Sequence, residues 1–216
     1  MRGSFHQELR SIEEAVIQMA TLVESEIAQA VHALTRRDTV QANQVIASDA
    51  EVNELQRGIR SRCISAMALQ APVARDLREL VTVQLVINEL ERMGDHAVGI
   101  AKQTMRIRDA EPLPVMGQLS EICTLVSAQV RDCIQAFVDV NVQQARAICT
   151  RDDEIDHRYR AIFSDLLATM SKDPALAQVV TSLLFAAHDL ERIGDRVTNI
   201  CEDVIFMVSG EIEELN

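Results

Sequence analysis

The chain carries one six-residue phrase twice: LERMGD at 90–95 returns a hundred positions later as LERIGD at 190–195. Two such copies at that distance indicate a duplicated chain. Each copy sets a Glu and an Asp four positions apart, and this spacing places both carboxylates on one face of a helix. The sequence therefore predicts two equivalent anionic patches, one in each half.

Apolar residues around both phrases recur at alternating steps of three and four, the period of a helix packed in a bundle. One series runs from Leu80 to Ala101 and the other from Val180 to Val208. No segment sustains a period of two with β-branched or aromatic residues, and the 216 residues include only 4 Pro and 7 Gly. This composition is typical of long helices with short connections, so we predict an all-α fold.

Start and stop signals along the chain predict six helices. Asp38 is a suitable N-cap for the second helix, and Pro72 and Pro174 are placed to open the third and the sixth. The helices are expected at about 5–36, 38–70, 72–108, 117–139, 141–170 and 174–208.

The Pro-rich break at 111–114 separates two halves that also match in their second helices, where 38–52 aligns with 141–155. Short loops favour an up-down-up order of the helices in each half. We therefore predict two tandem three-helix bundles related by internal duplication, with residues 1–110 as the first repeat and 111–216 as the second.

Charge and cysteine usage narrow the class of protein. A net charge of −12 argues against nucleic-acid binding and suits a protein that attracts cations or basic partner surfaces. The five cysteines are widely spaced without a CxxC pair, which fits reduced thiols in a cytosol. We find no run of 18 apolar residues, and residues 1–7 lack the apolar core of a secretory signal, so we expect a cytoplasmic protein.

The two phrases place their acids beside the apolar seam, where further oxygen donors extend the second stripe. Clusters of oxygen ligands suit cations such as Mg²⁺, Mn²⁺, Fe or Ca²⁺. The candidate metal ligands are Glu91, Asp95, Glu191, Asp195, Asn199 and Glu202.

A metal-free interpretation competes with this one, because Arg92 and Arg192 follow the glutamates and could pair with the carboxylates. Gly94 and Gly194 each cost a helix about 1 kcal/mol relative to Ala. A glycine kept twice at that cost indicates close approach of a neighbouring helix, whether for a site or for packing alone.

Catalytic motifs are scarce in this sequence. A ferritin-like di-iron site needs Glu-x-x-His on two helices, and only Glu154 with His157 fits that pattern. There is no GxGxxG or Walker loop, and no Ser lies in a nucleophile elbow. His96 lies beside Asp95, but its counterpart is Arg196, so we interpret it as a surface or hydrogen-bonding residue.

At these residues the chain resembles the PhoU family, the phosphate-signalling accessory proteins of bacteria. The resemblance rests on Phe5 with Glu8 and Leu9, on the run QAPVARDLR at 70–78, and on both copies of the acidic phrase. It implies two three-helix bundles side by side, often dimeric, with iron, zinc or another metal held by each phrase. Glu89 and Asp189, acidic in both copies, are further candidates.

The resemblance also implies a regulatory role without catalysis. Such proteins restrain phosphate uptake and the phosphate-starvation response by linking the phosphate ABC transporter ATPase to a membrane sensor histidine kinase. The expected cofactor is Fe, Zn, Mn or Mg, the expected assembly a homodimer, and no nucleic acid is expected. A di-metal carboxylate enzyme and a metal-free structural dimer are the alternatives.

The first half departs from the family pattern. The family tends to keep an Asn four residues after the signature Asp and an acid three residues further on. The second half has Asn199 and Glu202 there, but the first has Gly99 and Lys102. We therefore expect Lys102 to lie over the first site and to weaken cation binding there.

Overall fold

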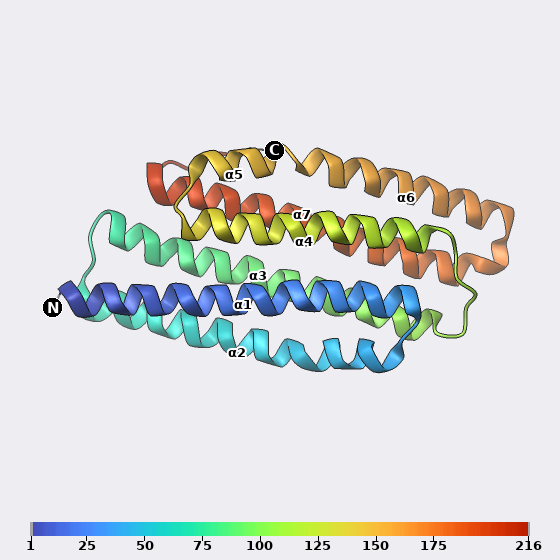
Figure 1. Ribbon diagram of the computed structural model, residues 1–216, viewed down its shortest axis with the longest axis horizontal. Helices are drawn as coiled ribbons and strands as arrows, with labels where there is room; N and C mark the ends of the chain where they lie inside the picture. Colours follow the sequence, from blue (N-terminus) through green and yellow to red (C-terminus); the bar gives the residue numbers. More distant parts are fainter. Residues whose placement is uncertain (1, 216) are drawn as a thin grey trace.

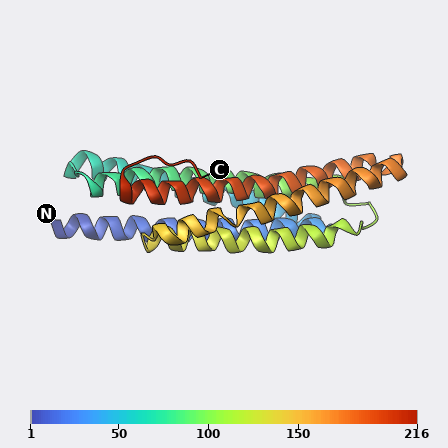
Figure 2. The same ribbon diagram turned by 90° about the horizontal axis from the view of Figure 1, so that it is seen from above.

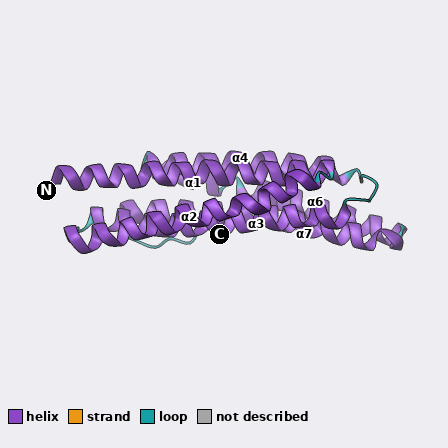
Figure 3. Cartoon of the chain, turned by 90° about the horizontal axis from the view of Figure 1, so that it is seen from below, coloured by secondary structure: helices purple, strands orange, loops and turns teal. Residues whose placement is uncertain are grey.

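The computed structural model describes residues 2–215, with side chains from Phe5 onward, and all regular structure in that range is helical (Figures 1 and 3). The elements are α1 (Arg2–Arg36), α2 (Thr39–Gln70), α3 (Arg75–Ile107), α4 (Val115–Val138), α5 (Val142–Cys149), α6 (Asp152–Lys172), the 3-10 turn η1 (Pro174–Leu176) and α7 (Ala177–Ser209). No helix in this range is long and apolar enough to cross a membrane.

The chain forms two helical bundles side by side, one of α1 to α3 and the other of α4 to α7, in which α5 and α6 together take the place of one helix (Figure 1). The units meet along two helix pairs, α1 with α4 and α3 with α7, which form two layers in Figure 2. The partners in each pair run in opposite directions. The predicted all-α fold of two duplicated bundles is confirmed.

The predicted seam is the core of both units. Leu80, Leu90 and Ala101 on α3 are fully buried, as are Val180 and Leu190 on α7. Because the acidic phrase shares its helix with this buried stripe, packing fixes the rotation of α3 and α7. That rotation decides which way the carboxylates face.

The turn between the first two helices is duplicated in detail. Arg37 and Val140 each adopt a left-handed backbone, with φ of 58° and 51°. The next residue caps the following helix: Asp38 accepts from the amides of Val40 and Gln41, and Asn141 accepts from that of Gln144. Positive φ reverses the chain, and the side-chain cap satisfies amides that lack a helical partner.

Three predicted helix limits were wrong. Residues 72–74 precede α3, which begins at Arg75, and Pro174 lies in η1 before α7 begins at Ala177. The expected helix at 141–170 is broken into α5 and α6 between residues 149 and 152.

A buried amide and a run of acids lie at the break. The Gln129 side chain donates to the carbonyl oxygen of Arg151 at 3.1 Å, and the Glu154 amide donates to the same oxygen at 3.2 Å. Residues 152–154 are all acidic and form the first turn of α6, where the helix dipole favours negative charge. The break therefore places Asp152 at a helix start, beside α7.

Candidate functional site

The second repeat gathers five carboxylates from two helices. Asp152, Asp153 and Asp156 of α6 and Glu191 and Asp195 of α7 line one cleft, with a volume of about 690 Å³. Arg146, Cys149 and Leu215 also line it. The predicted pair on α7 thus faces three acids of α6, which raises the density of negative charge in the cleft.

Burial and repulsion from neighbouring acids favour the neutral forms of Asp152 and Glu191. Burial raises the pKa of Asp152 to about 6, and the charges of Asp156, Asp195 and Glu191 add to the effect. Burial and Asp195 likewise raise the pKa of Glu191, while His188 opposes the shift. A positive ion in the cleft would relieve this repulsion.

Arginine pairing satisfies only part of the stripe. Arg192 Nη1 lies 3.3 Å from Asp195 Oδ2. His188 Nδ1 lies 3.1 Å from Glu191 Oε2, but that buried oxygen accepts no aligned hydrogen bond. In the first repeat Arg92 pairs with Glu89 at 3.0 Å. The salt-bridge interpretation therefore holds for Asp195, and Glu191 keeps an oxygen without a donor.

Gly194 lets the two acidic helices approach each other. A Cβ at this position would lie 3.0 Å from Asp152 Oδ1 and 3.3 Å from the Ile155 side chain. The contact at Gly94 is looser, since its Cβ would lie 3.5 Å from both Asp49 Oδ1 and Val52. The expected close approach of a neighbouring helix is thus tight in the second repeat and ordinary in the first.

The first repeat builds the corresponding cluster from Asp49 of α2 with Glu91 and Asp95 of α3. Burial, then Asp95 and Asp49, raise the pKa of Glu91. Burial and Asp95 raise the pKa of Asp49, against the lowering effects of Asn53 and Lys102. Lys102 therefore acts on this cluster, as the sequence indicated.

A buried acid on α1 adds to the first cluster. Glu26 is 1% exposed, and Ser48 Oγ donates to its Oε1 at 2.5 Å. Its Oε2 and Asp49 Oδ1 are both buried without a hydrogen-bond partner. Burial raises the pKa of Glu26 to about 7. The second repeat has Gln129 at the aligned position.

Two of the six predicted ligands make other contacts. Asn199 donates from Nδ2 to Glu89 Oε2 at 3.1 Å, and Glu202 Oε1 accepts from the Leu215 amide at 2.8 Å. Asn199 is thus turned toward α3, because α3 packs along that side of α7.

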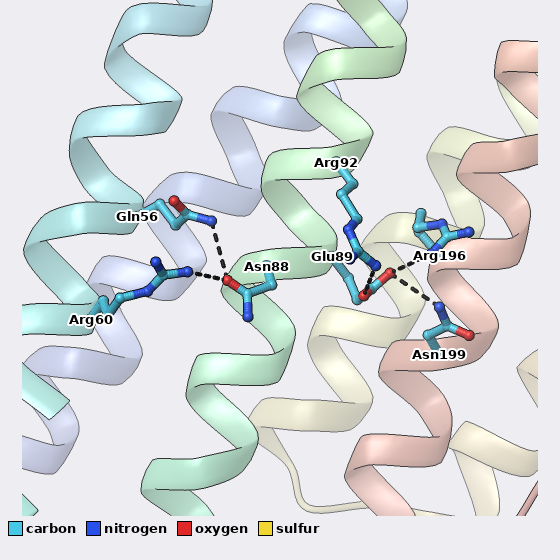
Figure 4. Close-up of polar contacts among 7 residues, drawn as sticks. All are labelled: Gln56, Arg60, Asn88, Glu89, Arg92, Arg196 and Asn199. Carbon is cyan, nitrogen blue, oxygen red and sulfur yellow. Dashed lines mark hydrogen bonds and ion pairs between the residues drawn. The ribbon is translucent and has the colours of Figure 1, made fainter. Parts of the chain in front are cut away.

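Glu89 and Asp189 join the two repeats. Glu89 Oε2 lies 3.2 Å from Arg196 Nη1, and its Oε1 lies 3.0 Å from Arg92 (Figure 4). Asp189 Oδ1 lies 2.9 Å from His96 Nδ1. His96 is a hydrogen-bonding residue, as predicted. Both acids hold α3 to α7 and have basic partners there, so we exclude them from the candidate clusters.

The duplicated geometry has a match among known proteins. The PhoU domain matches this sequence twice, over residues 16–104 and 119–204. The chain belongs to the PhoU family.

Full-length relatives agree with this assignment. The phosphate-specific transport system accessory protein PhoU homolog of Clostridium acetobutylicum is 34% identical over 100% of this chain and 99% of its own length. The phosphate-specific transport system accessory protein PhoU of Escherichia coli K12 is 32% identical, over 97% of this chain and 87% of its own.

Solved structures of PhoU have the same fold. The Pseudomonas aeruginosa structure has a TM-score of 0.91 at 30% identity, covering 96% of this chain and all of that one. The Streptococcus pneumoniae phosphate transport system regulatory protein PhoU also has a TM-score of 0.91, at 29% identity, covering 98% and 100%. This PhoU-family chain belongs with accessory and regulatory proteins and is not an enzyme.

The side chains of both clusters have the right chemistry for a cation, but they are not already arranged as a binding site. Their donors are carboxylate oxygens, the ligands that hard cations prefer. Within the described range, no three His, Cys, Asp or Glu side chains are grouped closely enough to hold a metal ion. A cation would therefore have to draw the carboxylates together. The orphaned oxygens of Glu26, Asp49 and Glu191 are available for that.

The acids from the other helices were missed in the sequence. Asp49 and Asp152 stand at aligned positions of the duplicated second helix, so the duplication itself was a usable signal. Glu26 interrupts the apolar stripe of the first helix between Val23 and Ala30, which is a second signal. Asp156 has no acidic counterpart in the first repeat, since Asn53 stands there.

Proposed function

We propose that this PhoU-family chain is a cation-binding regulatory accessory protein of a phosphate-specific transport system. It restrains phosphate uptake and the starvation response by linking the transporter ATPase to a membrane sensor histidine kinase. The proposal draws on the names of its relatives, which are accessory or regulatory proteins of phosphate transport. The predicted cytoplasmic location and homodimer belong to the same proposal.

The observation that supports cation binding is the same in both repeats. An aspartate of the neighbouring helix packs against the glycine of each acidic phrase, Asp49 against Gly94 and Asp152 against Gly194. In the second repeat Asp152, Asp156, Glu191 and Asp195 would hold the ion. The bound ion would supply positive charge that offsets their repulsion. Oxygen donors favour Mg²⁺, Mn²⁺ or Fe, and Zn²⁺ also accepts carboxylates.

The first-repeat site is the weaker of the two in this proposal. Asp49, Glu91 and Asp95 would hold the ion, with Glu26 beneath them. The positive charge of Lys102 already stabilises the Asp49 carboxylate, so Lys102 competes with a cation for the negative charge of this cluster. We therefore assign the higher cation affinity to the second repeat.

In this proposal, regulation depends on the negative charge of the two acidic clusters. Without a cation, the acidic clusters attract basic loops on the transporter ATPase or the kinase. A bound cation lowers that attraction and changes which partner is favoured, because charge complementarity controls both encounter rate and specificity.

The test compares two double variants that remove the same charge. Glu191→Gln with Asp195→Asn alters the second cluster, whereas Glu14→Gln with Glu111→Gln alters two exposed acids outside it. We expect the first variant to lose metal in elemental analysis of protein purified without chelator, and to release repression of phosphate uptake in cells. The control should do neither.

Two outcomes would contradict the proposal. Equal metal content in both variants would exclude the second cluster as a cation site. Loss of metal with normal repression would show that the cation has no part in regulation. A metal-free structural dimer predicts the first outcome, with no metal in either variant.

A further inference from the structure

Aromatic side chains, rare in this chain, gather on the outside of the second repeat. The sequence has only 5 Phe and 1 Tyr, yet Tyr159, Phe163 and Phe185 meet on α6 and α7. Phe163 is 41% exposed and Phe185 51%. With Thr181, Leu184 and His188 they line a pocket of about 300 Å³. Exposed apolar surface of this kind marks interaction sites more often than scattered single residues do.

The first repeat does not build this pocket, so the fold does not require it. The repeats are aligned by matching Gly94 with Gly194 and Asp49 with Asp152. In this alignment, polar residues of the first repeat stand at the positions of Tyr159, Phe163 and His188. These polar residues are Gln56, Arg60 and Asn88.

The polar residues of the first repeat bond to one another. Gln56 Nε2 donates to Asn88 Oδ1 at 3.2 Å, and Arg60 donates to the same oxygen (Figure 4). The two repeats thus present different chemistry at equivalent places: a closed polar cluster in the first and open aromatic rings in the second.

The aromatic pocket adjoins the acidic cleft. The rings of Tyr159 and His188 lie 6.1 Å apart, and His188 Nδ1 is 3.1 Å from Glu191 of the cleft. Asp156 lies one turn before Tyr159 on α6 and lines the same cleft. An occupant of the pocket would therefore lie beside Glu191 and Asp156 of the acidic cleft.

We propose that the aromatic pocket and the acidic cleft together form a docking surface, present only in the second repeat, for a segment of a partner protein. The segment inserts a Leu or Phe side chain between Phe163 and Phe185 and directs a Lys or Arg, one helical turn away, toward Glu191 and Asp156. The negative cleft selects for basic residues, and the same charge disfavours an anionic membrane surface.

This proposal rests on the proposed function, because it names the surface that an adaptor would use. It also makes the repeats unequal. The duplication supplies two similar acidic clusters, but only one of them stands beside an apolar anchor site.

The test uses the full chain and a fluorescent amphipathic helical peptide of Leu and Lys, read by anisotropy. Two comparison peptides replace Lys by Glu or Leu by Ser. We expect the Leu-Lys peptide to bind best, and Phe185→Ser or Phe163→Ser to weaken its binding about tenfold. Leu85 is the first-repeat counterpart of Phe185 and is 39% exposed, so Leu85→Ser is the matched control. It should leave binding unchanged.

Three results would overturn the docking surface. The first is equal affinity for all three peptides. The second is an affinity of Phe185→Ser for the Leu-Lys peptide that equals that of the parent, and the third is a loss of affinity in Leu85→Ser as large as that in Phe185→Ser. A change of oligomeric state in Phe185→Ser would also overturn it, by showing that a second copy covers the pocket. Metal content and phosphate uptake are measured on the same variants. If Phe185→Ser binds the peptide normally while the parent still binds metal and represses uptake, the docking surface fails and the proposed function stands.

Discussion

Glu89 of α3 and Arg196 of α7 form an ion pair of 3.2 Å between the repeats, and His96 and Asp189 make the corresponding contact at 2.9 Å with the helices exchanged. The duplication thus extends to the interface itself. The two copies differ in burial, since the Glu89 and Arg196 side chains are 11% and 13% exposed while those of His96 and Asp189 are more exposed.

Loss of Arg196 should be costly because it leaves a nearly buried carboxylate with fewer partners. We expect Arg196→Met to destabilise the chain by about 2 kcal/mol, with Arg92 and Asn199 retaining part of the compensation. Urea unfolding measures the change. Adding Glu89→Gln should recover most of it, because the double variant buries no uncompensated charge.

Substitution of His96 is the matched comparison. His96→Asn should cost less than Arg196→Met, since water screens this more exposed pair. Equal losses at the two positions would mean that burial does not control the strength of the interface pairs.

Gly99 lies against the second of these pairs. A Cβ there would lie 2.5 Å from Asp189 Oδ2, so Gly99→Ala must shift this carboxylate, whose other oxygen contacts His96. We expect a net loss of about 1 kcal/mol, despite the better helix propensity of Ala. Gly58 on α2 meets nothing within 4 Å, and Gly58→Ala should gain about 0.5–1 kcal/mol. If Gly99→Ala and Gly58→Ala raised the thermal stability by similar amounts, the contact between position 99 and Asp189 would be refuted.

Glu26 should make stability depend on pH. Its pKa is raised to about 7 in the folded chain, so the folded state binds a proton more tightly than the unfolded state. Stability therefore falls as pH rises from about 4.5 to 7. We expect Glu26→Gln to exceed the parent by about 2 kcal/mol at pH 8 and to match it at pH 4. Urea titrations across this range, with exposed Glu14→Gln as control, provide the measurement. A parallel pH profile for parent and Glu26→Gln would contradict the assignment.

Asp152 should lower the stability of the folded chain without a cation and raise it when a cation is added. In chelator, Asp152→Asn should be slightly more stable than the parent at neutral pH, because it removes one of the repelling carboxylates. With millimolar Mn²⁺ the parent should gain about 5 °C in Tm, and the variant should gain less, since binding to the folded state alone stabilises it. Equal shifts in parent and variant would exclude Asp152 from the cation site.

Local patterns predicted most of the fold because helix period and repeat spacing are properties of neighbouring residues. The break between α5 and α6 escaped prediction. At the break, Gln129 of α4 bonds to a carbonyl more than twenty residues away, a contact that no local pattern contains. The division of the chain at residue 110 and the six-residue ligand set stay predictions. Asn199 in particular contacts Glu89, which no pattern within its own helix revealed.

The sequence by itself determined the duplication, the helical class and the pair of acids on α3 and on α7, because each follows from spacing along one helix. Only the tertiary structure decided which other acids join them. Asp49, Asp152 and Glu26 reach the clusters because helices pack against Gly94 and Gly194, and the burial of Glu26 depends on three helices at once. Distances between helices, which set both repulsion and burial, are determined by packing across the whole core.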